Sequence, residues 1–281
     1  MLIELLPLIF AGFLVSSTLA FAQIIEAQED SDMATDSHFR EELGVNQYTT
    51  PSIEQLFKTL DSLKPIPIQE LTRAPRALRL DNRVKFALSF GVLIGDGFLA
   101  VEGEEVKAIE PLGRELLRRA KGLGVAQRVS RHSKQLLDLA KQLDWRGLRK
   151  ELIVTQNDVE SAMLDLRDEE MVHLLSLGGW IRGLEIGAAS VATDFSPERV
   201  SKLRQLDLLD YYLQRLDTLA TPLKSTPLIS QIISGLKQVR LRLADTPAVS
   251  QEDVSGIQTT ARNLVALIEG DTPSTAAIRS E

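Results

Sequence analysis

The sequence contains no cysteine in 281 residues. The chain therefore has no disulfide framework, and packing alone must hold the fold together. The same absence excludes thiolate metal sites, iron–sulfur clusters and cysteine nucleophiles. It also excludes the lipid-modified cysteine that anchors a bacterial lipoprotein.

Histidine is scarce, with three residues at positions 38, 132 and 173. Glu170 and His173 have the carboxylate–imidazole spacing of a helical pair of metal ligands, so a metal-dependent bundle is one hypothesis. A di-metal centre of the ferritin type needs a second such pair, and the sequence has none.

Sequence signatures of catalysis are also missing. No Gly-x-Ser-x-Gly turn occurs, and Gly122-Leu123-Gly124 joins two expected helices and has no preceding strand to make it a phosphate-binding loop. We therefore expect no cofactor and favour a protein that is not an enzyme.

The N-terminus predicts the compartment. Residues 5–22 form an apolar run that ends in Ala20-Phe21-Ala22, with small residues at the two positions that signal peptidases require. We interpret residues 1–22 as a signal peptide cleaved after Ala22, which predicts a periplasmic or secreted protein. Because residues 1–4, which precede the run, carry Glu4 and no basic residue, retention as a membrane anchor is the alternative. We expect no transmembrane span in the mature chain.

The mature chain divides by composition. Residues 23–49 hold seven acids against Arg40 and no apolar period, which is typical of a flexible acidic arm. Residues 50–269 are predicted to form one helical bundle, and residues 270–281 a disordered tail. The formal net charge of −7 argues against a nucleic-acid binder.

Helix punctuation recurs through residues 50–269. Thr50, Ser196 and Thr226 each precede a proline, as an N-cap residue does, and capping boxes are predicted at Thr155 and Ser250. Apolar residues recur three and four apart, and β-type alternation is nearly absent. The fold class is therefore all-α. The expected helices are 51–62, 81–102, 104–121, 126–143, 145–153, 156–191, 197–220, 227–243 and 250–269, with an extended connector over 64–78.

Two expected helices, 84–103 and 172–192, are unusually apolar and rich in glycine. Glycines at multiples of four allow two helix backbones to approach closely, and we predict that these helices form the centre of the bundle. The glycine stripes are Gly91, Gly95 and Gly103 in the first helix and Gly179, Gly183 and Gly187 in the second. Residues 88–94 also resemble residues 175–181, which suggests a duplication with a pseudo-twofold axis.

Charged residues interrupt both of these helices. Asp96 needs a partner if it is buried, and Arg182 on the other helix can supply one, with Glu185 or Glu102 accepting the remaining guanidinium protons. One interpretation is an ion pair that fixes the register of the two helices. The alternative is a polar ligand pocket formed by Asp96, Trp180, Arg182 and Glu185.

Residues 112–150 carry eleven Lys and Arg against three acids. Neighbouring acidic helices can neutralise them, or they can form a basic surface for an anionic partner. The residues chosen for this surface are Arg118, Arg119, Arg128, Arg131 and Lys134.

Three functional hypotheses follow. The leading one is an exported, non-enzymatic helical protein that acts through its surface on a protein or an envelope component. The others are a small-ligand binder around Asp96, Arg182 and Glu185, and a metal-dependent protein that uses Glu170 and His173.

Overall fold

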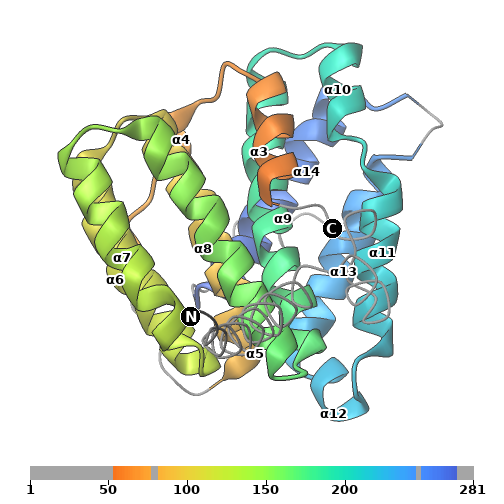
Figure 1. The fold of residues 1–281 in the computed structure, drawn as a ribbon. Coiled ribbons are helices and arrows are strands. Elements are labelled where there is room, and N and C mark those ends of the chain that lie inside the picture. Colours follow the sequence, from red (N-terminus) through yellow and green to blue (C-terminus); the bar gives the residue numbers. More distant parts are fainter. Residues whose placement is uncertain (1–52, 77–81, 245–247, 271–281) are drawn as a thin grey trace, which may run out of the picture. The chain divides into compact units, whose positions relative to one another are not determined.

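The computed structural model describes residues 53–76, 82–244 and 248–270, and the secondary structure of this part is helical throughout (Figure 1). The all-α bundle is confirmed. The predicted signal peptide, the acidic arm, Thr50 and residues 271–281 lie outside the described residues. The helices are α3 (Ile53–Ser62), α4 (Ile68–Leu71), α5 (Arg83–Glu102), α6 (Val106–Leu123), α7 (Ala126–Lys141), α8 (Trp145–Asp165), α9 (Glu169–Thr193), α10 (Pro197–Leu203), α11 (Leu206–Thr218), α12 (Thr221–Lys224), α13 (Pro227–Arg242) and α14 (Gln251–Ile268).

The centre of the bundle is formed by α5 and α9. Both helices are buried around nearly their whole circumference, which is why their sequences show no polar face. Helix α9 packs chiefly against α5 and α14, while α6, α7 and α8 follow one another as neighbours beside α5 (Figure 1). By length and composition α5 could cross a membrane, but 94% of its apolar window is buried inside the protein. It is a core helix in this structure.

The backbones of α5 and α9 touch where glycines face each other. A Cβ atom on Gly91 would lie 2.0 Å from the carbonyl oxygen of Leu175, and one on Gly178 would lie 1.9 Å from that of Leu88. Further along both helices, Gly95 packs against the side chain of Arg182. The two helices therefore run in the same direction, and α6, α7 and α8 together form the connection that this requires.

The contact between α5 and α9 is reciprocal. Gly91 meets Leu175, and Gly178 meets Leu88. Gly91 lies 87 residues before Gly178, and Leu88 lies 87 residues before Leu175, which is the offset of the predicted repeat. Such an exchange is what a twofold axis between two helices produces. The duplication itself stays a prediction.

Two glycines of the second stripe, Gly183 and Gly187, face other parts of the chain than α5. Gly183 accommodates Leu56 of α3, and Gly187 lies against Leu63 and Leu203. Helix α3 is amphipathic and buries Ile53, Leu56, Phe57 and Leu60. The glycines spaced four apart in α9 thus leave room for α3, whereas the adjacent Gly178 and Gly179 contact α5.

Three of the predicted caps are present. Ser196, Thr226 and Ser250 each accept a hydrogen bond from the backbone of the first helical turn, and Ser250 forms a complete capping box with Asp253. The box predicted at Thr155 is wrong, because Thr155 lies inside α8 and donates its hydroxyl proton to the carbonyl of Glu151. The helical backbone is instead interrupted between α8 and α9, where Arg167 has a φ of +54°.

Two other boundaries also differ from the prediction. The helix expected over 197–220 is divided into α10 and α11 at Arg204 and Gln205. The connector expected over 64–78 contains the single turn α4. We call residues 63–76 the strap, because they run from α3 across the central helices.

Candidate functional site

The buried charges of α5 and α9 form an ion pair, as predicted. Nε of Arg182 donates to Oδ1 of Asp96 at 2.8 Å, and Nη1 donates to Glu185 at 2.6 Å. Asp96, Arg182 and Glu185 are 8%, 1% and 5% exposed. Of the two acceptors predicted for Arg182, Glu185 is the one used, while Glu102 pairs with Lys64 and Arg149.

A second arginine on Asp96 was missed by the sequence analysis. Nε of Arg73, on the strap, lies 3.1 Å from both carboxylate oxygens of Asp96, and Nη2 donates to Oδ2 at 2.9 Å. Burial by itself would raise the pKa of Asp96, but Arg73 and Arg182 outweigh it and hold that pKa below its usual value. The strap has no apolar period, so no pattern assigned Arg73 a partner.

The space beside Asp96 is small. A cavity of about 10 Å³ lies between the strap and α5, with Thr72, Arg73, Asp96 and Leu99 in its wall. That volume holds about one water molecule. In this conformation, therefore, no metabolite fits next to the carboxylate.

Arg119 forms a second buried ion pair, which corrects its assignment to the basic surface. Its side chain is 0% exposed, and it donates to Glu269 at 2.9 Å and to the carbonyl of Ser89 at 2.6 Å. Burial raises the pKa of Glu269 despite this pairing and lowers that of Arg119. Counting charges along the chain placed Arg119 on the surface, whereas its position on α6 points to the core.

Buried arginines also bind the backbone of the strap. Arg182 donates to the carbonyl of Leu71 at 2.6 Å, and Arg119 donates to that of Arg76 at 3.1 Å. Arg199 donates to the carbonyls of Leu63 and Lys64 at 2.7 and 2.8 Å. Charge-assisted bonds of this kind are among the stronger hydrogen bonds in proteins. The strap is thus held on the core by arginine side chains at three points.

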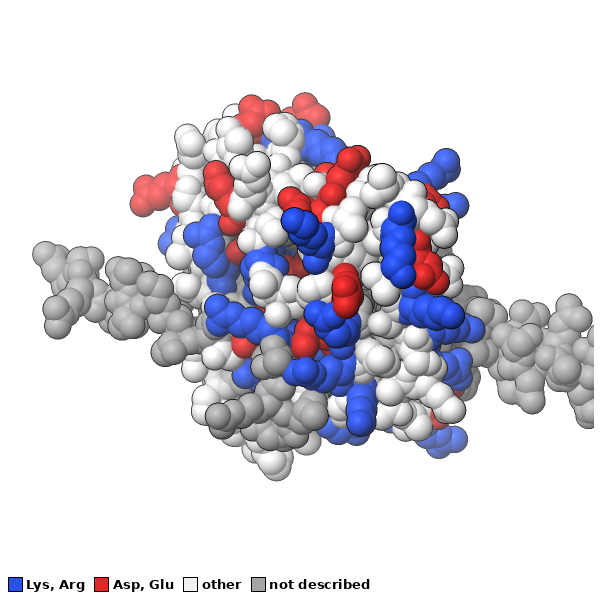
Figure 2. Space-filling model, turned by 90° about the vertical axis from the view of Figure 1, so that its left-hand side faces the viewer, with Lys and Arg blue, Asp and Glu red and all other residues white. Residues whose placement is uncertain are grey.

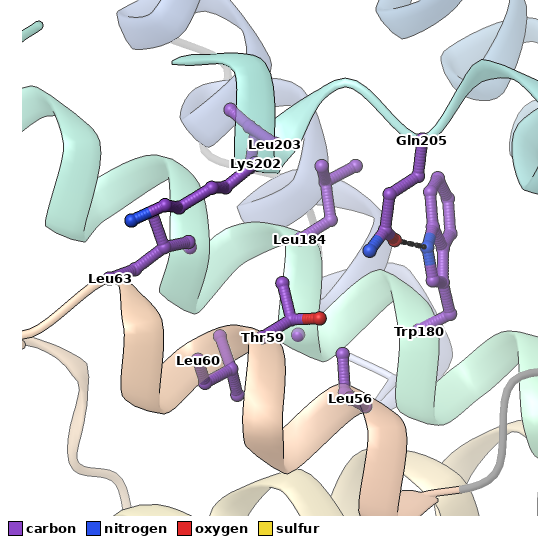
Figure 3. Close-up of a pocket in the computed structure, with 11 residues that line it drawn as sticks. Leu56, Thr59, Leu60, Leu63, Trp180, Leu184, Lys202, Leu203 and Gln205 are labelled. Carbon is purple, nitrogen blue, oxygen red and sulfur yellow. Dashed lines mark hydrogen bonds between the residues drawn. The ribbon is translucent and has the colours of Figure 1, made fainter. Parts of the chain in front are cut away.

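Trp180, predicted to join the Asp96 pocket, points into another cavity. Its indole N–H donates to Gln205 at 3.0 Å, and its ring lies 5.5 Å from that of Tyr212. Figure 3 shows Trp180 and Gln205 at one end of a cavity between α3, α9 and α10. The cavity measures about 20 Å³, and leucine is the commonest residue in its wall. Trp180 therefore belongs to the contact between α9 and its neighbours.

Glu170 and His173 do not converge on a common point. Glu170 is exposed, while Nδ1 of His173 lies 2.8 Å from the hydroxyl of Tyr211. In the part of the chain that the structure describes, no three His, Asp or Glu side chains are grouped to hold a metal ion. The spacing on one helix was present, but no second helix supplies further ligands.

His173 makes a testable contribution to acid stability. Burial, together with the positive charge of Arg215, lowers its pKa from 6.5 to about 4. Because the folded pKa lies below the unfolded one, the stabilisation is complete above pH 6.5 and is lost as the pH falls towards 4. We expect His173→Gln to flatten the loss of thermal stability over this interval. An unchanged pH profile of the melting temperature would contradict this prediction.

His132 is paired by residues that lie far from it in sequence. Its Nδ1 lies 2.6 Å from Glu151, its Nε2 lies 2.8 Å from Asp158, and Arg131 also pairs with Asp158. Burial would raise the pKa of Asp158, but bonds to His132 and Arg131 lower it overall. No acid lies on the turn of His132 itself, so no local pattern indicates that α8 supplies both carboxylates.

The predicted basic surface is partly neutralised. Arg128 and Arg131 are exposed but pair with Asp165 and Asp158 of α8, at 2.8 and 2.5 Å. Arg118 and Lys134 lie on the outer side of α6 and α7, and Arg118 is 3.6 Å from Glu115.

Comparisons with protein-family models, with curated proteins and with solved structures found no match. The function is therefore argued from the molecule itself.

Proposed function

We propose that this is an exported, non-enzymatic helical protein that binds an anionic protein or envelope component through the outer face of α6 and α7. The apolar run that ends at Ala22 supports export. The intact mass of the protein recovered from the producing cell tests the cleavage, because the mature chain would begin at Gln23.

The observation that carries the proposal is a row of exposed cations, which we call the basic face. On α6 the exposed basic residues are spaced seven, four and three apart, so they share one side of the helix, while Arg119 is buried. Helix α7 adds two more beside them. The basic face comprises Lys107, Arg114, Arg118, Lys121, Lys134 and Lys141, all of them exposed.

The charge of the basic face is only partly compensated. Arg114, Arg118 and Lys141 have acidic neighbours on their own helices. Within the described residues, Lys107, Lys121 and Lys134 have no ion-pair partner. Figure 2 looks onto this side of the molecule, where Lys and Arg gather. A surface of one sign attracts partners of the other, and salt screens the attraction.

Two cavities within the described part of the chain are too small for chemistry on a substrate, which favours binding at the surface. The cavities beside Asp96 and Trp180 measure about 10 and 20 Å³, too small for a substrate. The buried carboxylates of Asp96, Glu185 and Glu269 each lie against an arginine.

Charge reversal tests the basic face. We expect the protein to be retained on immobilised heparin, used as a polyanion probe, and released by salt. The triple variant Arg118→Glu, Lys121→Glu, Lys134→Glu should bind at least about tenfold more weakly, because three attractions become repulsions. The matched control is Lys58→Glu, Lys224→Glu, Lys237→Glu, which changes the net charge equally on α3, α12 and α13. Equal weakening in both variants, or no retention of the wild type, would contradict the proposal.

A second candidate function is favoured by one observation. The carboxylate of Asp96 is covered by Arg73, which lies on the non-helical end of the strap after α4 rather than on a core helix. Movement of the strap would open a polar site at Asp96, Arg182 and Glu185 to a small ligand.

A further inference from the structure

Asp96 binds two guanidinium groups that are held very differently. The side chain of Arg182 is 1% exposed and fixed inside α9, whereas that of Arg73 is 27% exposed and lies on residues 72–76, which form no helix. Arg73 bonds to both oxygens of the carboxylate with its Nε and Nη2. Arg73 is therefore bound much as a guanidinium ligand would be.

The charges around Asp96 favour a cation in this position. Arg182 lies between Asp96 and Glu185, Arg262 approaches Glu185 at 3.6 Å, and Glu269 adds its field to that felt by Arg73. Without Arg73, the group Asp96, Arg182 and Glu185 would carry a formal charge of −1, which only the largely exposed Arg262 offsets, and it does so at Glu185 rather than at Asp96. A buried carboxylate that loses one of its partners is destabilising, so a cation that restores the contact stabilises the fold.

We propose that Asp96 is a binding site for a monosubstituted guanidinium compound, and that Arg73 of the strap occupies this site in the absence of the ligand. The inference rests on the second candidate function above. A guanidinium presents two parallel N–H groups to a carboxylate, which an ammonium group does not. The ligand replaces Arg73, and residues 72–76 then leave the core, which also breaks the hydrogen bond from Arg119 to the carbonyl of Arg76.

Tethering explains why the site is closed. Arg73 is attached to α4, which ends at Leu71, so its effective concentration at Asp96 is on the order of millimolar or higher. A free ligand must compete with it. Removal of Arg73 should therefore strengthen ligand binding by at least about tenfold relative to the wild type.

The test is whether a free guanidinium compound can replace the side chain that Arg73→Ala removes. We expect butylguanidinium to raise its melting temperature saturably, while butylammonium and sodium chloride at equal concentration do not. Arg240→Ala, which removes an arginine from an exposed pair with Asp210, is the matched control and should not respond. If Arg73→Ala does not fold alone, Arg73→Lys retains the charge without the forked geometry and is used in the same way.

Two further measurements decide the proposal. The double variant Arg73→Ala, Asp96→Asn should lose the response to butylguanidinium, and an equal response in single and double variants would overturn the assignment to Asp96. In the wild type, high butylguanidinium should speed amide hydrogen exchange in residues 72–76. Unchanged exchange would overturn the displacement of the strap. Because the heparin experiment does not involve Asp96, failure here leaves the basic face unaffected.

Discussion

Gly178→Ala is expected to destabilise the protein by about 3 kcal/mol or more, whereas Gly179→Ala is expected to be tolerated. A Cβ atom at position 178 would lie 1.9 Å from the carbonyl oxygen and 2.7 Å from the carbonyl carbon of Leu88. These are backbone atoms of α5, so neither can rotate away. The two central helices would have to separate, and their shared packing would be lost.

The neighbouring glycine is the matched control. A Cβ atom at position 179 has its nearest contact at 3.5 Å from the carbonyl oxygen of Gly91, which is an ordinary van der Waals distance. Alanine there should even gain up to about 1 kcal/mol, because glycine is a poor helix former. Urea unfolding of both variants measures the difference. Similar midpoints would show that α5 and α9 are not in backbone contact.

Arg182→Ala is expected to cost about 3–5 kcal/mol. The change leaves Asp96 and Glu185 without the guanidinium that lies between them, and the carbonyl of Leu71 loses its donor. It also removes the aliphatic stem that packs on Gly95. Asp96 and Glu185 thus each lose one of two arginine partners, and the carbonyl of Leu71 loses its donor, in one substitution.

The comparison variant is Arg240→Ala, because Arg240 pairs with Asp210 in solvent. Exposed pairs contribute little to stability, so its urea midpoint should stay close to that of the wild type. The dependence of the folding stability on acid pH gives a second measurement. The lowered pKa of Asp96 stabilises the fold above pH 3.8, and this contribution is lost as the pH falls through the folded pKa. If both arginine variants unfolded at the same urea concentration, the core ion pair would have no special role.

Local signals in the sequence predicted local structure well. The caps at Ser196, Thr226 and Ser250 were correct because a cap depends on residues within one turn. The prediction failed at Thr155, where the same residue pattern occurs inside a continuous helix. A capping pattern shows that a helix can start at a residue. It does not show that a helix does start there.

Only part of the candidate site could be predicted from the sequence, because some of its contacts join segments that are distant in the chain. The pair Asp96 and Arg182 was inferred because each charge interrupts an apolar helix and needs a partner. Arg73 and the carboxylates around His132 were missed, since they come from segments whose position depends on the packing of other helices. Arg119 was wrongly assigned to the surface, because a count of charges along the chain does not tell which way a side chain points.

The sequence by itself determined that this chain is helical, where three of its helices begin, and that α5 and α9 are the most apolar helices of the bundle. These properties follow from side-chain periodicity and from hydrogen bonds that close within a few residues. Only the tertiary structure decided which arginines are buried, that Gly178 rather than Gly179 has no room for a Cβ atom against the α5 backbone, and that the strap fills the space at Asp96. Those outcomes depend on how helices are rotated and placed against each other, and contacts between residues distant in the chain fix that arrangement.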